Sequence, residues 1–335
     1  MNMKQWVADV IANPHRIAIP IMTHPGIEYL NKTVREAVTN GRVHSDAICA
    51  LNNIYPAAAC TVIMDLTVEA EAFGAEVVFS DDEIPTVKGR LVYDRESVEQ
   101  LTIPDINSSR VPEYILANKL TVERIKDKPV LGGCIGPFSL AGRLFDMSEL
   151  MMACYTEPDV AEMLLTKCTE FLKDYVLALK KQGINGIIIA EPAAGLLSPD
   201  GCQEFSSKYV KEIIELVQDD EFLVILHNCG NIGHCTEAML NTGAMGYHFG
   251  NMMDMKLALE QCPSNVLVMG NLDPVGLFKN ATPQQMKEAT LNLLHQTDGL
   301  SNFVISSGCD VPPLTPDANI RAFYEGLEEY NYLRL

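Results

Sequence analysis

The stretch FLVILHNCGN, residues 222–231, joins a short apolar run to two side chains that can bind a metal. His227 and Cys229 are two residues apart, so at the end of an extended strand their side chains leave on the same face. Cys309 follows a second apolar run, 303–305. One imidazole and two thiolates suit zinc and leave a fourth position open, as a catalytic zinc requires. Structural zinc sites usually draw on CxxC pairs, and the chain contains none.

The rest of the chain repeats this rhythm, because short apolar runs rich in β-forming residues alternate with longer segments of helical periodicity. The predicted strands are 17–22, 61–64, 129–134, 186–189, 223–226, 245–249, 266–269 and 303–306. Strands that alternate with helices imply a parallel sheet, and eight of them imply an α/β fold of the (β/α)8 TIM-barrel type. An open doubly wound sheet is the alternative.

Several predicted strands end in small or turn-forming residues with polar neighbours. Examples are AEPAAG (190–195), HNCGN (227–231) and SSGCDVPP (306–313). Such loops are expected at the C-terminal mouth of a barrel, where active sites lie. His227, Cys229 and Cys309 all fall in these loops, which strengthens the prediction of a metal site.

Two regions of the sequence are additional to the strands and helices of a simple barrel. Residues 1–16 predict an N-terminal helix laid against it. Residues 76–115 contain two extended runs, 76–80 and 86–93, around a hairpin with proline and glycine, which predicts a β-hairpin excursion after the second strand. Because no repeat, low-complexity tract or linker marks a second domain, residues 1–335 are expected to form one domain.

Composition excludes several classes of partner. The 335 residues carry a formal net charge of -19, whereas a nucleic-acid partner would attract the opposite sign. No apolar stretch approaches the roughly 20 residues that span a bilayer, and no apolar signal segment is present, so a cytoplasmic protein without a membrane partner is expected. Ten cysteines in a chain of this length do not suggest a disulfide scaffold. Nothing indicates the oligomeric state.

Four segments carry a resemblance to a known family. They are MDLTVEAEAFGAEV (64–77), GGCIGPFSLAGRLFD (132–146), HNCGN (227–231) and SSGCDVPPLTPDANI (306–320). The chain resembles the uroporphyrinogen decarboxylase superfamily and, within it, the zinc-dependent methylcobamide:thiol methyltransferases, such as those that use coenzyme M. HxC with the later GCD is the most specific part of the resemblance.

The resemblance implies a function and a ligand set. The zinc ligands would be His227, Cys229 and Cys309, and the chain would move a methyl group from a methylated corrinoid to a thiol such as coenzyme M or homocysteine. No segment resembles a corrinoid-binding domain, so the methylcobamide is expected on a separate corrinoid protein. The decarboxylase branch has an arginine-rich N-terminal strand, which is missing here. Asp65 therefore keeps the position of the decarboxylases' catalytic aspartate but is without those arginines. Decarboxylation of a tetrapyrrole and non-catalytic binding of zinc or a corrinoid are the alternatives.

Further side chains are expected around the mouth. Glu191 could fill the open zinc position or take the thiol proton; alternatively it caps a helix. Asp65 could orient the substrate or hydrogen-bond the zinc-binding histidine; alternatively it caps the helix predicted at 67–73. His248 and Asn251, after the sixth strand, are candidates for binding the cofactor or substrate. Asp310 is expected to hold its loop through backbone N–H groups.

Overall fold

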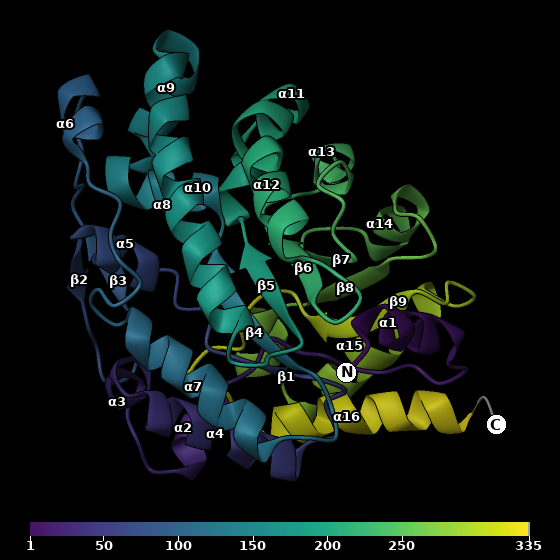
Figure 1. The fold of residues 1–335 in the computed structure, drawn as a ribbon. Coiled ribbons are helices and arrows are strands. Elements are labelled where there is room, and N and C mark those ends of the chain that lie inside the picture. Colours follow the sequence, from purple (N-terminus) through teal and green to yellow (C-terminus); the bar gives the residue numbers. More distant parts are fainter. Residues whose placement is uncertain (334–335) are drawn as a thin grey trace.

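The computed structural model describes residues 1–333 and shows seven parallel strands in a curled sheet, with helices outside it (Figure 1). The strands are hydrogen-bonded in the order β1-β4-β5-β6-β7-β8-β9. Because each strand runs parallel to its neighbours, their carboxyl ends meet at one edge. The strands of this sheet are β1 (Cys60–Thr61), β4 (Val130–Ile135), β5 (Gly186–Ala190), β6 (Leu223–Asn228), β7 (Gly246–Phe249), β8 (Leu267–Leu272) and β9 (Phe303–Ser307).

Helices fill most of the connections. They are α1 (Met3–Ala12), α2 (His24–Tyr29), α3 (Val34–Thr39), α4 (Gly41–Ile54), α5 (Val68–Phe73), α6 (Arg95–Gln100), α7 (Val111–Arg124), α8 (Pro137–Phe145), α9 (Met147–Thr156), α10 (Pro158–Lys180), α11 (Pro199–Cys202), α12 (Lys208–Val217), α13 (Thr236–Leu240), α14 (Met255–Gln261), α15 (Pro283–Gln296) and α16 (Asp317–Tyr332). A 3-10 helix, η1 (Pro192–Leu196), and two π-helical turns, η2 (Gln203–Ser207) and η3 (Pro274–Lys279), complete them. Between residues 1 and 333, no helix combines the length and the apolar character needed to cross a membrane.

The prediction of a regular strand at 17–22 is wrong. Only Ala18 forms a bridge, parallel to Ile305 of β9, and on its other side the Ala18 carbonyl accepts the Ala58 N–H just before β1. The segment thus lies between the two outer strands of the curled sheet and takes the place of an eighth strand. Pro20 interrupts the ladder because proline has no backbone N–H.

Side-chain hydroxyls continue the contacts where backbone pairing stops. The Ile21 N–H donates to Ser307 Oγ and the Met22 N–H donates to Thr61 Oγ1, each at 3.1 Å. The sheet is therefore closed at this point by hydrogen bonds to side chains. A pattern of apolar residues does not predict such contacts.

The seven other predicted strands are present, with ends that differ by up to three residues. β1 is much shorter than predicted. The Ile63 N–H donates to His44 Nε2, and the Met64 N–H donates to the Asp310 carboxylate. Side-chain acceptors thus bind the backbone N–H groups that would have paired in a longer β1.

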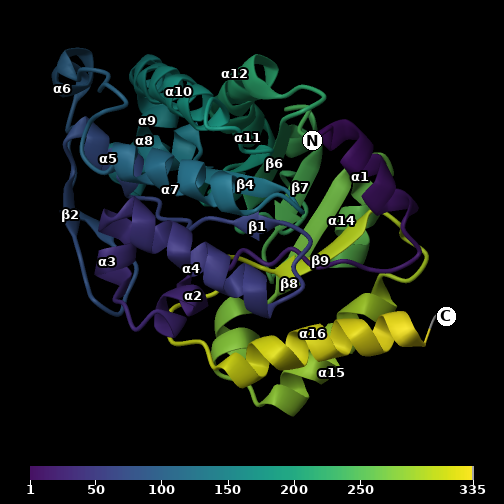
Figure 2. The same ribbon diagram turned by 60° about the horizontal axis from the view of Figure 1, so that its bottom comes forward.

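The barrel interior is apolar below the mouth. Alternate residues of adjacent strands, including Ile188 of β5 and Leu223 and Ile225 of β6, form one buried cluster. Met3 and Val7 of α1 belong to the same cluster, so the predicted N-terminal helix is present and closes one end of the interior. Figure 2 shows α1 across the sheet end and α15 beside α16 on the outside.

A small antiparallel pair, β2 (Glu76–Val78) and β3 (Thr86–Lys88), follows α5. Val77 pairs with Val87. Ile84 and Pro85, in the connection between the two strands, line the cavity that contains the predicted metal ligands. This excursion therefore forms part of the wall around the site.

Candidate metal centre

The three predicted metal ligands lie together at the mouth of the sheet. The ligand atoms of His227, Cys229 and Cys309 all lie within 4.8 Å of one another. Among residues 1–333, no other set of three histidine, cysteine or acidic side chains meets in this way. His227 is buried, whereas both cysteines are partly exposed toward a cavity of about 220 Å³.

A chain of hydrogen bonds fixes the tautomer of His227. The Ser306 hydroxyl donates to the Ile19 carbonyl at 2.7 Å, so Ser306 Oγ accepts from His248 Nε2 at 2.8 Å. Burial, and then the neighbouring His227 ring, lower the pKa of His248 well below its ordinary value, so this imidazole is neutral. His248 Nδ1 is therefore an acceptor, and it receives the N–H of His227 Nδ1 at 2.8 Å.

The second nitrogen of His227 consequently keeps its lone pair. His227 Nε2 is buried and has no hydrogen-bond partner, which is unusual for a buried polar atom. A metal ion is the kind of partner that such a neutral imidazole nitrogen binds.

The two cysteines share a hydrogen bond that changes the pKa of both thiols. The hydrogen bond with Cys309 lowers the pKa of the Cys229 thiol below its ordinary value, although burial acts in the opposite direction. The same hydrogen bond, together with burial, raises the pKa of Cys309. The first proton of the pair is therefore lost more easily than that of an isolated thiol, and the second less easily.

Backbone contacts position the Cys309 loop. Asp310 accepts the Met64 N–H at 3.0 Å, and the Val311 N–H donates to the Ile21 carbonyl at 2.8 Å. Asp310 thus holds its loop through a backbone N–H group, as expected from the sequence. At residue 308, a Cβ atom would lie 2.7 Å from the Asn251 backbone nitrogen, so only glycine permits this close approach.

The donor set fits zinc. One neutral imidazole and two thiolates are ligands that zinc prefers, and three protein ligands leave a position for a substrate atom. The buried Nε2 of His227, which has no hydrogen-bond partner, fits a metal ligand independently of the two cysteines.

Glu191 caps a helix, which is the alternative role considered for it in the sequence. Its carboxylate accepts the backbone N–H groups of Phe138 at 2.9 Å and Ser139 at 2.6 Å, so it caps the N-terminus of α8. Burial raises the pKa of Glu191 to about 7, against the effect of these N–H groups. The side chain is not among those that line the cavity, so the roles of zinc ligand and proton acceptor find no support in its geometry.

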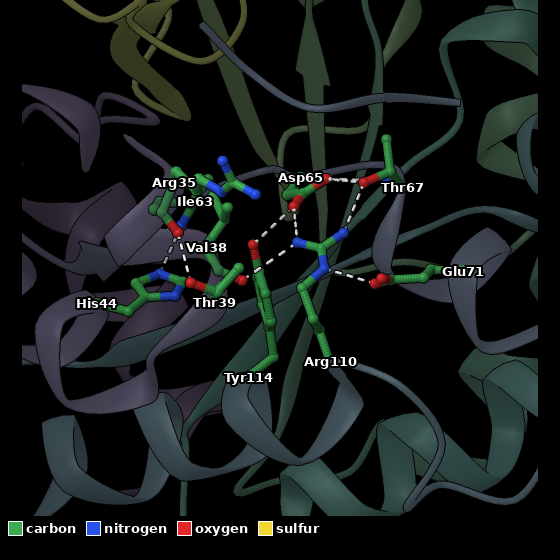
Figure 3. A network of polar contacts seen from close by, with 10 residues as sticks. All are labelled: Arg35, Val38, Thr39, His44, Ile63, Asp65, Thr67, Glu71, Arg110 and Tyr114. Carbon is green, nitrogen blue, oxygen red and sulfur yellow. Dashed lines mark hydrogen bonds and ion pairs between the residues drawn. The ribbon is translucent and has the colours of Figure 1, made fainter. Parts of the chain in front are cut away.

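Asp65 also lies in a network of its own, drawn in Figure 3. One of its oxygens accepts from the Thr67 N–H and hydroxyl; the other accepts from Arg110 at 2.5 Å and Tyr114 at 3.0 Å. Arg110, at the start of α7, also contacts Glu71 of α5. The N-terminal segment 17–30 supplies no arginine to Asp65, and its arginine partner comes from a later segment of the chain. Within residues 1–333, Asp65 forms no hydrogen bond with His227.

His248 and Asn251 do not line the cavity. His248 is fully buried and both of its ring nitrogens have partners, so it has no nitrogen left for a ligand. Asn251 is exposed in the loop after β7. The structure therefore gives His248 a place beneath the metal site and does not support the candidate role of either residue in contacting the cofactor.

Arg143 is a residue of the mouth that the sequence reasoning passed over. It lies in the last turn of α8 and lines the cavity of the metal ligands. One signal was present in the sequence, because Arg143 is the single basic residue between Lys128 and Lys167. The backbone N–H groups of Phe138 and Ser139 at the start of α8 are occupied by Glu191.

Comparison with known proteins agrees with this fold. A solved structure described as a methyltransferase from Methanosarcina mazei aligns with a TM-score of 0.87 over 98% of both chains, at 22% identity, which shows a shared fold. A B12-independent methionine synthase from Shewanella aligns with a TM-score of 0.57 at 15% identity over 87% of both chains.

Two sequence relatives are named for two different activities. "Methylcobamide:CoM methyltransferase MtbA" of Methanosarcina acetivorans is 31% identical over 278 residues, 82% of this chain and 80% of the relative. "Uroporphyrinogen decarboxylase" of Legionella pneumophila is 26% identical over 287 residues, 83% of this chain and 81% of the relative. Residues 8–330 match the family described as Uroporphyrinogen decarboxylase (URO-D). The chain belongs to the URO-D family.

Proposed function

We propose that this chain is a zinc-dependent methyltransferase that moves a methyl group from a methylated corrinoid, carried by a separate protein, to a small-molecule thiol. The observation that carries the proposal is the meeting of His227, Cys229 and Cys309 at a cavity, with His227 Nε2 bare. The 31% identical relative named as a methylcobamide:CoM methyltransferase supports the same class of reaction.

Zinc bound to these three residues would deprotonate a thiol, which is otherwise only a few per cent thiolate near neutral pH. Two thiolates and a neutral imidazole balance the charge of the ion, so a further thiolate makes the site net negative and keeps its sulfur electron-rich. His248 holds His227 in the tautomer that leaves Nε2 bare, and Asp310 holds the Cys309 loop. In the overall reaction a carbon–sulfur bond forms, the carbon–cobalt bond breaks and the thiol proton is released.

The test is methyl transfer from methylcobalamin to a panel of thiols, followed by the cobalamin absorbance and by detection of the thioether. Zinc-loaded protein should be active with at least one thiol, and zinc-free protein should be inactive. Coenzyme M and homocysteine are the first acceptors to compare. A zinc-loaded protein that methylates no thiol, with free or protein-bound methylcobamide, would favour a non-catalytic binding protein.

The structure gives a reason to disfavour tetrapyrrole decarboxylation. Both oxygens of Asp65 are occupied by Thr67, Arg110 and Tyr114, and the side chain is fully buried. The segment 17–30 carries no arginine for substrate carboxylates. We therefore expect no coproporphyrinogen from uroporphyrinogen, and formation above a heat-inactivated control would contradict this.

A further inference from the structure

We propose that Arg143 binds an anionic group on the acceptor thiol and so determines acceptor specificity, an inference that rests on the proposed function. The metal site accounts for the sulfur of the acceptor but not for the other end of the molecule. Arg143 lies where that other end would extend.

Two cavities meet at Arg143. The first, of about 220 Å³, contains His227, Cys229 and Cys309. The second, of about 280 Å³, lies between α8 and the hairpin of β2 and β3 and includes Gly89 in its lining. Arg143 lines both cavities, as do Leu66 and Pro192, and it is the only charged side chain of these three. A small thiol bound through sulfur in the first cavity can therefore place its opposite end near this guanidinium.

The guanidinium of Arg143 interacts with the Asp65 carboxylate only through space and not by direct contact. Within residues 1–333, it forms no ion pair and no hydrogen bond, whereas the arginine of the nearby network, Arg110, contacts Asp65 and Glu71 at 2.5 Å each. The acidic side chains that share its cavities are engaged elsewhere. Asp146 accepts the Ser148 N–H, and Asp310 accepts the Met64 N–H.

The chemistry of the lining favours an anionic ligand group. An arginine remains charged at neutral pH and presents donors in a planar fork that matches a carboxylate, sulfonate or phosphate. No lysine and no other arginine lines either cavity. The chain as a whole carries a formal net charge of -19, so a positive group at this mouth also counters the repulsion of an anionic acceptor.

A purely structural role is the competing explanation. Arg143 lies in the last turn of α8, where a positive charge interacts favourably with the helix dipole. That role predicts a change of stability that is independent of the acceptor, whereas ligand recognition predicts a change that depends on acceptor charge.

The experiment compares three thiols of similar size with zinc-loaded protein: anionic 2-mercaptoethanesulfonate, neutral 2-mercaptoethanol and cationic 2-aminoethanethiol. Arg143→Met should raise KM for the anionic thiol by about 10- to 100-fold, the range for a lost charge-assisted hydrogen bond, and leave the neutral thiol within about twofold. Arg143→Glu should reverse the preference toward the cationic thiol. Arg42→Met, which removes an exposed charge from α4, is the matched control and should change nothing.

Binding without the methyl donor gives a second readout. Calorimetry should show the same loss of affinity for the anionic thiol in Arg143→Met. In wild-type protein, ethanesulfonate should compete with the anionic thiol and ethanol should not, a comparison that needs no folded variant. Equal KM values for anionic and neutral thiols in wild type, or equal losses for both in Arg143→Met, would overturn the role of Arg143. Failure of wild type to methylate any thiol would instead overturn the proposed function.

Discussion

His227 and His248 face each other across neighbouring strands, with 2.8 Å between their Nδ1 atoms. The two residues are partners in the register of β6 and β7. Since His248 Nε2 is held by Ser306, the ring of His248 can only accept at Nδ1, and His227 must donate there. The candidate metal ligand His227 is thus oriented by a second histidine, whereas a carboxylate or carbonyl more usually orients a metal-bound histidine.

Replacing His248 with phenylalanine removes this acceptor and keeps the volume of an aromatic ring. We expect zinc affinity to fall by about 10- to 100-fold, the range for residues that orient a metal ligand. Competition with a chromophoric chelator measures this. Asn251→Ala, in the exposed loop after the same strand, is the control; equal zinc affinity in His248→Phe and wild type would contradict the tautomer argument.

Replacing Cys309 with serine should remove zinc and preserve the fold. A serine hydroxyl is a poor zinc ligand, and the candidate ligands lie at or just beyond the strand ends, above a complete apolar interior. Metal analysis of protein purified without chelators should give about one zinc per chain for wild type and far less for the variant. Far-ultraviolet circular dichroism should be unchanged. An unfolded variant would indicate a structural zinc, and full occupancy would show that the ligand assignment is wrong.

Zinc binding should release protons and weaken as the pH falls. The pKa of Cys229 is lowered and that of Cys309 is raised by their mutual hydrogen bond, so near neutral pH the pair retains at least one proton that the metal must displace. Calorimetry of zinc binding in buffers with different ionisation enthalpies counts the protons released. A proton count of zero for wild type would contradict the shared proton.

Glu191→Gln should reduce stability without removing zinc. The variant loses one of two carboxylate acceptors at the start of α8, which costs about 1 kcal/mol on the scale of helix caps. Because the folded pKa of Glu191 is raised to about 7 from 4.5, its protonated form stabilises the folded state below about pH 4.5, and this contribution is lost as the pH rises through 7. Urea unfolding at pH 5 and 8 measures both effects. A stability difference between variant and wild type that does not change with pH would contradict the raised pKa.

Arg110→Met should be strongly destabilising. It leaves the Asp65 carboxylate buried without its cation, and breaking a buried ion pair in this way costs about 3–5 kcal/mol. Urea unfolding gives the free energy, with Arg42→Met as the exposed control. A loss below 1 kcal/mol, in the range of surface pairs, would show that the network contributes little to stability.

The strand ends that carry the metal ligands were predictable, because apolar runs mark parallel strands and parallel strands share one mouth. The directions of other side chains were not. Glu191 directly follows β5, but α8, which begins more than 50 residues earlier, supplies the N–H groups that orient it. Arg110 reaches Asp65 from a separate helix. Pro20 ends regular pairing in a segment whose apolar pattern is that of a strand. Each difference depends on a contact between segments far apart in the chain.

Segment 17–22 forms the seam between β9 and β1 and affects where backbone amide protons first exchange with solvent. Ile21 and Met22 are tied to the neighbouring strands by the hydroxyls of Ser307 and Thr61 and not by a continuous backbone ladder. Local opening is easiest where regular hydrogen bonding is sparse. Amide deuterium uptake should therefore begin at this seam before it reaches β5 and β6. Since Ile21 also lines the cavity of the metal ligands, the side of the cavity formed by the N-terminal segment is the one that loosens, while the strand carrying His227 stays in place.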